Sequence, residues 1–450
     1  MSDGKRLSAQ CDFLKETNLI MRQTVLITLF FLFIQSVKGQ KHDIPNDSIS
    51  IFFDEIKTAS KKNTDLWNKD LYGPMILINP QTRELFANEP DTAGLLKRNG
   101  DRYSGILPDH INIANTAVNW NGKRWAMIML PLPQNKQNRI NLLAHESFHS
   151  IQPVLGFTLH NVENNHLDQK DGRIYLRLEL EALKKAIRST SGKELKKHLT
   201  HAFTFRKYRH SLYKNSDTAE NLLELNEGIA EFTGVMVSGR NKAEAAAWFL
   251  KGIDDFFKNP TFVRSFAYHT TPVYGYLLYP KDKNWNKTIT GDTDLTRYFS
   301  KAFNINIPND LKRTAENISG HYNGKVISKE ETEREEKTKK RIAEYKLKFI
   351  SQPHFEIKFE KMNVSFDPRN IMPVEDKGTV YPNIRVTDLW GILTVENGAL
   401  MSPNWDKISI SSPVQTEGRK ISGDGWVLEL AEGYTIGKDG VNGNYKLSKN

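Results

Sequence analysis

The chain has 450 residues, of which 38% are hydrophobic and 10% aromatic, so it can form two or three folded domains and is not a disordered protein. Its net charge is +10, but the basic residues are scattered rather than gathered into one patch, which argues against a nucleic-acid partner. The only cysteine, Cys11, excludes a disulfide framework and a cysteine-rich metal cluster. Any metal must therefore be held by His and carboxylate side chains.

Residues 21–39 have the pattern of a signal peptide. Arg22 supplies the positive start, residues 25–34 form an apolar run, and small residues occur near Val37-Lys38-Gly39. A run of this length is too short to cross a bilayer, which takes about 20 residues, so no permanent membrane anchor is expected. A buried N-terminal strand or helix is the alternative. We predict an upstream extension over residues 1–20 and a secreted or periplasmic protein.

The segment before residue 136 is predicted to form a helix and then strands. Apolar residues at helical spacing predict a helix over 47–62, and residues 74–78 indicate a buried strand. Asn121-Gly122 between two strand-like runs predicts a hairpin with a type I′ turn. We expect residues 127–132 to be an edge strand that pairs with an extended peptide substrate.

A helix is predicted over residues 136–152, ended by Pro153, and it carries the sequence His145-Glu146-Ser-Phe-His149. Residues i and i+4 lie on one face of a helix, so both imidazoles can bind one metal ion while Glu146 acts as a base. A chance match on an amphipathic helix is the alternative. At ordinary residue usage this arrangement arises in about one in a hundred chains of this length.

A catalytic zinc ion needs a third protein ligand, and Glu227 in Asn226-Glu227-Gly228-Ile-Ala230-Glu231 is the favoured source. The small residues beside it allow close approach to another helix, and Glu231 can accept a hydrogen bond from a ligating histidine. The helix is expected to begin at Ser216, with a cap formed by Asp217 and Glu220. The competing ligands are Glu179, Glu181, His160, His166 and Asp168. If Glu179 and Glu181 are not ligands, we expect them to be solvated charges on a helix.

The pairing of His145-Glu-Ser-Phe-His149 with Asn226-Glu227-Gly-Ile-Ala-Glu231-Phe resembles the gluzincins, a group of zinc metallopeptidases that includes thermolysin, over roughly residues 110–280. The resemblance implies His145, His149 and Glu227 as zinc ligands, Glu146 as the general base and Glu231 as the partner of a ligand. It also implies a zincin-like catalytic domain.

Three features depart from the family or are left open by it. The stretch from His149 to Glu227 is longer than in compact members, and no Gly-x-Met-Glu-Asn sequence supports an aminopeptidase. Gln152 and Leu155 stand where the metzincin pattern has Gly and His. A donor to the oxyanion is expected from a tyrosine, Tyr268 or Tyr274, or from His269; the aromatic residues can equally be core or rim.

The rest of the chain predicts helices at 174–188, 193–212 and 241–257, and a charged connector helix capped by Ser328 and Glu331 and running to about Phe349. Strand-like runs after residue 355 predict a small β domain, either a sandwich or a partial barrel. The predicted fold class is α+β, with residues 40–325 as catalytic domain, 326–350 as connector and 351–450 as β domain.

Together these features predict a secreted zinc-dependent metallopeptidase that hydrolyses peptide bonds in a peptide or protein substrate, with Zn²⁺ as cofactor and Glu146 accepting the proton of the attacking water. Two alternatives remain open: a zinc hydrolase of a non-peptide substrate, and an inactive zincin scaffold that acts as an envelope binding protein.

Overall fold

The computed structural model describes residues 46–108, 111–158, 162, 164–366, 371–439 and 443–449. The chain divides into two compact units, residues 1–52 and 53–450. Helix α2 (Asn46–Lys62) confirms the helix predicted over 47–62. Cys11 and the predicted signal peptide lie outside the described residues. Within the described ranges, no helix combines the length and hydrophobicity that a membrane span needs.

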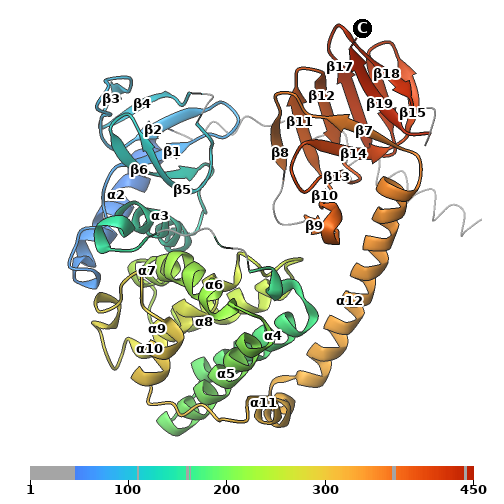
Figure 1. Ribbon diagram of the computed structural model, residues 1–450. Helices are drawn as coiled ribbons and strands as arrows, with labels where there is room; N and C mark the ends of the chain where they lie inside the picture. Colours follow the sequence, from blue (N-terminus) through green and yellow to red (C-terminus); the bar gives the residue numbers. More distant parts are fainter. Residues whose placement is uncertain are drawn as a thin grey trace, which may run out of the picture. The chain divides into compact units, whose positions relative to one another are not determined.

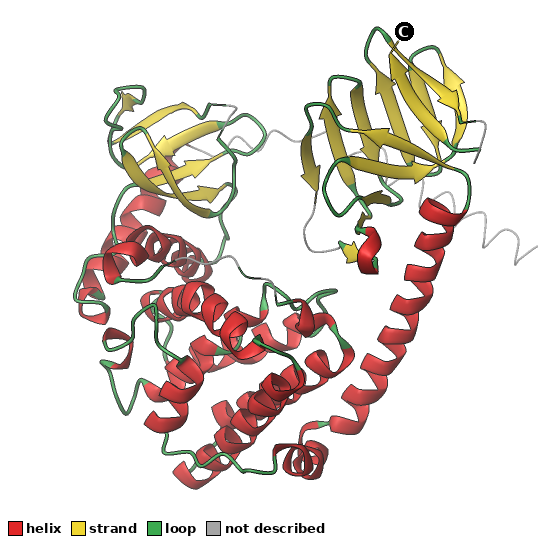
Figure 2. Ribbon diagram, in the orientation of Figure 1, coloured by secondary structure: helices red, strands yellow, loops and turns green. Residues whose placement is uncertain are grey.

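The chain contains both helices and strands, as Figure 2 shows, and the strands described form three sheets. The first sheet has six strands in the order β3-β4-β2-β1-β6-β5. Their bounds are β1 (Met75–Ile78), β2 (Glu84–Ala87), β3 (Lys97–Asn99), β4 (Arg102–Ile106), β5 (Thr116–Trp120) and β6 (Lys123–Met129). Its core is built from alternate side chains of these strands, among them Ile76, Ile78, Leu85, Trp125 and Met127.

The β5–β6 hairpin confirms the turn predicted at Asn121-Gly122, because both residues have positive φ, 46° and 76°. The prediction of the edge strand is wrong. Strand β6 pairs with β1 in parallel on one side and with β5 on the other, so it is internal, and β5 is the edge. The parallel pairing of β1 with β6 joins segments about fifty residues apart, and no local pattern reports such a pairing.

Helices make up the region that follows this sheet (Figure 1). Helix α3 (Lys136–Ile151) ends one residue before its predicted end. The others are α4 (Lys170–Arg188), α5 (Gly192–Leu212), α6 (Ser216–Leu223), α7 (Ile229–Val237), α8 (Lys242–Phe256), α9 (Thr271–Leu278), α10 (Leu295–Ala302) and α11 (Leu311–Ser319). A π-helical turn, η4 (Glu224–Gly228), joins α6 to α7.

Two predicted caps are wrong, because the glutamates concerned are buried in ion pairs. Glu220 accepts hydrogen bonds from Arg209 instead of capping α6, and no side chain caps that helix. The charged helix α12 (Gly324–Lys346) begins before Ser328, and its Glu331 accepts hydrogen bonds from Arg173 and another arginine of α4. Each glutamate therefore links two helices through charge-assisted hydrogen bonds.

After α12, the chain forms the predicted strands as a sandwich of two sheets. The seven-stranded sheet has the order β18-β19-β7-β14-β13-β10-β9, and the six-stranded sheet β15-β16-β17-β12-β11-β8. The strands are β7 (His354–Lys358), β8 (Asn363–Phe366), β9 (Met372–Pro373), β10 (Thr379–Tyr381), β11 (Ile384–Asp388), β12 (Gly391–Val395), β13 (Ala399–Met401), β14 (Lys407–Ser411), β15 (Pro413–Glu417), β16 (Lys420–Gly423), β17 (Trp426–Leu430), β18 (Tyr434–Lys438) and β19 (Tyr445–Lys449).

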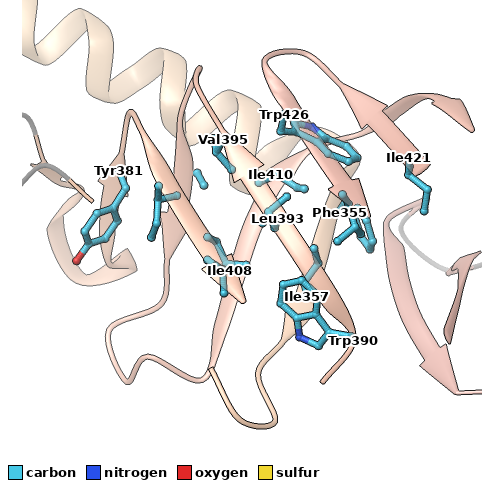
Figure 3. Packing of buried hydrophobic residues seen from close by; sticks show 14 of the residues in the cluster. Phe355, Ile357, Tyr381, Trp390, Leu393, Val395, Ile408, Ile410, Ile421 and Trp426 are labelled. Carbon is cyan, nitrogen blue, oxygen red and sulfur yellow. The ribbon is translucent and has the colours of Figure 1, made fainter. Parts of the chain in front are cut away.

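One hydrophobic core lies between these two sheets. Figure 3 shows Phe355 and Ile410 of the seven-stranded sheet with Leu393 and Trp426 of the six-stranded sheet that packs on it. All four residues are at most 2% exposed. Alternate residues of most of these strands point into this core, as face-to-face packing of sheets requires. Of the two architectures left open by the sequence, the sandwich is the one observed.

Candidate metal centre

Helix α3 and the turn η4 bring three potential metal ligands together. His145 and His149 are one helical turn apart on α3, and their Nε2 atoms are 3.1 Å apart. The Oε2 atom of Glu227, from η4, lies 3.4 Å from each of these Nε2 atoms. Among the residues described, these three are the one group of three or more His, Cys, Asp or Glu side chains close enough to hold a metal ion.

The three separations fit a tetrahedral zinc ion. Zinc binds histidine nitrogen and carboxylate oxygen at about 2.0–2.1 Å, and two ligands at tetrahedral angles are then about 3.3–3.4 Å apart. The observed distances of 3.1, 3.4 and 3.4 Å agree with this ligand-to-ligand distance to within a few tenths of an ångström. Two imidazoles and one carboxylate also match the ligand types that zinc prefers in sites with a fourth, open position.

The second nitrogen of each histidine has a partner that orients the ring. His145 Nδ1 lies 3.2 Å from Glu231 Oε2, and His149 Nδ1 lies 2.7 Å from Gln152 Oε1. A hydrogen bond donated from Nδ1 leaves Nε2 as the nitrogen free to bind a metal. Asn141 donates to both oxygens of Glu231 at 3.2 Å, so that carboxylate is itself held in place.

His145 and Glu227 shift each other's pKa. Burial lowers the pKa of His145, but hydrogen bonds to Glu227 and Glu231 outweigh it and raise the pKa to about 10. Burial raises the pKa of Glu227, but its contacts with the two histidines hold the pKa well below the ordinary range. Burial also raises the pKa of Glu146. A divalent cation bound to this cluster would compete with a proton for His145.

Glycines in the chain allow the elements of the site to approach closely. A Cβ atom on Gly234 of α7 would lie 2.7 Å from the carbonyl oxygen of Asn141 on α3, so only glycine fits this crossing. We expected Gly228 to allow such contact with a helix. Gly228 does allow a close approach, to the segment that carries Tyr268. A Cβ atom on Gly228 would lie 3.1 Å from the carbonyl oxygen of Ala267 and 2.8 Å from the Cβ atom of Thr271.

A cleft of about 130 Å³ opens beside the three ligands. The residues that line it are Asn115, Thr116, Ala117, Arg124, Glu146, His149, Asn226, Glu227 and Tyr268. Glu146 is 5% exposed, and its Oε2 atom is buried without a hydrogen-bond partner among the described residues. Such an unpaired carboxylate oxygen is costly unless it has a role, which a proton acceptor would have.

Of the two tyrosines predicted as donors to the oxyanion, Tyr268 lines this cleft. Its hydroxyl donates to Glu227 Oε2 at 2.5 Å, and its ring stacks on His145 with 5.4 Å between centroids. Burial and the neighbouring Glu227 raise the pKa of Tyr268, so the hydroxyl remains a donor. The prediction for Tyr274 is wrong: this residue is fully buried, and its hydroxyl donates to Glu179.

The competing ligands lie elsewhere. Glu179 is buried rather than solvated, in a network with Arg206 and Arg209, and Glu181 pairs with Lys184. His166 contacts Glu220, and Asp168 accepts from the backbone of Phe262. His269 is half-buried and lines a second cavity with Glu231 and Trp248. His160 lies outside the described residues.

Sequence reasoning missed two residues of this site. No role at the site was predicted for Gln152, which accepts from His149 Nδ1 and also donates to the carbonyl oxygen of Asn226 at 2.9 Å, a bond that ties α3 to η4. Arg124 reaches the cleft from β6. The position of Gln152, a polar residue three positions after His149, is a weak signal for its role. No feature of the sequence pointed to Arg124.

Comparisons of the chain with protein-family models, curated proteins and solved structures found no match. The residues of the site and their geometry therefore carry the functional argument.

Proposed function

We propose that this protein is a zinc-dependent metallopeptidase with a gluzincin-like, zincin-type catalytic domain. The observation that supports it most is the set of three separations near 3.3 Å between His145, His149 and Glu227, with an outer partner on each histidine. A structural ion pair would not need Glu146 to be buried with an unpaired oxygen beside this cluster. The proposal explains both features at once.

In the proposed reaction, each residue of the cleft has one task. A bound zinc ion would polarise the carbonyl group of the substrate and make water more acidic. Glu146 takes the proton from the attacking water and delivers it to the leaving nitrogen. The Tyr268 hydroxyl, which donates to Glu227 in this structure, donates during the reaction to the substrate oxygen that gains negative charge.

Strand β5 supports a peptide as the substrate. It is the edge of its sheet, and its first residues, Thr116 and Ala117, line the cleft. An edge strand presents backbone N–H and C=O groups that an extended peptide can pair with, which places a peptide bond next to Glu146.

The experiment that tests the proposal is cleavage of an unbiased peptide library by the zinc-loaded chain. Glu146→Gln should abolish cleavage and keep zinc, because it removes the proton acceptor but no ligand. Glu181→Gln, a carboxylate paired with Lys184 away from the cleft, is the matched control and should cleave as the wild type does. A wild-type chain that binds zinc and cleaves no peptide would overturn the peptidase proposal.

A further inference from the structure

Arg124 places a positive charge in the cleft. It lies near the start of β6, and it is the only Lys or Arg among the described residues that line the cleft with Glu146 and His149. Its two hydrogen bonds go to neutral oxygens, Asn119 Oδ1 at 3.4 Å and the His149 carbonyl at 3.3 Å. No carboxylate of the described residues pairs with it.

The backbone of α3 holds this guanidinium in position. The carbonyl group of His149 would normally accept from the N–H of residue 153, but Pro153 has none. Arg124 donates to this carbonyl instead, which brings the guanidinium to the end of α3 beside a metal ligand. Its Nε atom is buried without a hydrogen-bond partner among the described residues, so the guanidinium is incompletely satisfied.

The guanidinium keeps donors for a ligand. Arginine has five N–H groups, and each terminal nitrogen has two. Each terminal nitrogen of Arg124 uses one, which leaves a further N–H on both. A positively charged guanidinium with a spare N–H on each terminal nitrogen can bind both oxygens of a carboxylate.

We propose that Arg124 binds a carboxylate group of the substrate close to the bond that is cleaved. The inference rests on the proposed peptidase function and adds a substrate class to it. The cleft of about 130 Å³ spans both Arg124 and Glu146, so the carboxylate and the scissile bond belong to the same or neighbouring residues. The carboxylate is either the C-terminal group of the peptide or the side chain of an Asp or Glu.

The test measures peptide binding by calorimetry on the full-length, zinc-loaded Glu146→Gln variant, in which the peptides are bound but not cleaved. Short peptides are compared as free acid and C-terminal amide, and with Asp or Glu replaced by Asn or Gln. The carboxylate form of one pair should bind about 10- to 100-fold tighter, the range for a charge-assisted contact. Which pair responds identifies the source of the carboxylate.

Adding Arg124→Gln should remove this preference, with the zinc content unchanged. The matched control, Arg98→Gln, removes the same charge from an exposed position in β3 of the same sheet and should keep the preference. Equal binding of acid and neutral peptides, or a preference that survives Arg124→Gln, would overturn the inference and leave the proposed function standing. A folded chain that binds no zinc would overturn the proposed function, and the inference with it.

Discussion

Replacing Gly234 by alanine tests how the close crossing of α7 and α3 supports the metal site. The new Cβ atom would lie 2.7 Å from the carbonyl oxygen and 2.8 Å from the Nδ2 atom of Asn141, so the two helices must separate by about half an ångström or more. Asn141 Nδ2 is the donor that holds Glu231, and Glu231 orients His145. The substitution therefore disturbs a ligand that it does not touch.

Two effects of this substitution can be estimated separately. Overpacking costs about 1–3 kcal/mol, and the higher helix propensity of alanine returns about 1 kcal/mol, so stability should fall by about 0–2 kcal/mol. Loss of an outer partner of a metal ligand should weaken zinc binding by about 10- to 100-fold. Stability falls little, and zinc affinity falls strongly.

The assays are urea denaturation and zinc competition with a chromogenic chelator. Gly252→Ala is the matched control, because Gly252 is inside α8 and its new Cβ would meet His269 only at an ordinary 3.5 Å. The control should gain up to about 1 kcal/mol of stability and keep its zinc affinity. If Gly234→Ala behaves like Gly252→Ala in both assays, the α7–α3 crossing does not position the ligands.

Three further substitutions test other parts of the account. Gln152→Leu removes the acceptor of His149 Nδ1, so zinc affinity in the same competition assay should fall about 10- to 100-fold. Gln137→Leu, at a half-buried position of α3 that does not line the cleft, should leave zinc affinity unchanged. Tyr268→Phe should keep one zinc per chain but lower kcat about 100- to 1000-fold, and an unchanged kcat would exclude the hydroxyl as the oxyanion donor. Arg206→Gln removes the buried cation that pairs with Glu224 and one of the two that pair with Glu179, so the free energy of unfolding should fall by about 3–5 kcal/mol in urea. Exposed Lys339→Ala should leave the urea midpoint unchanged.

Local pattern predicted the elements of this protein better than their arrangement. The periodicity of α3, the Asn121-Gly122 turn and the strands of the sandwich depend on neighbouring residues, and they were predicted within a few residues. The edge strand was not, because the order of the first sheet depends on the parallel pairing of β1 with β6. Likewise, no local signal shows that Glu179, Glu220 and Glu331 are buried in ion pairs with distant arginines.

The candidate site follows the same rule. Helical spacing places His145 and His149 on one face, and the composition around Glu227 indicated the third residue of the cluster. Tyr268 and Tyr274 are six residues apart, but α9 begins between them, at Thr271, and turns the second tyrosine into the core. Arg124 reaches the site through a tertiary contact with the His149 carbonyl group, and Gln152 bonds to the π-helical turn η4; neither contact was predicted from the sequence.

The measurement that tests the central claim most directly is zinc stoichiometry, by elemental analysis of the purified full-length wild type, Glu227→Ala and Glu181→Ala. The account predicts one zinc per chain in the wild type and in Glu181→Ala, and a large loss of zinc in Glu227→Ala, whose fold is verified by circular dichroism. A well-folded wild type without stoichiometric zinc, or a Glu227→Ala variant with undiminished zinc, would contradict it.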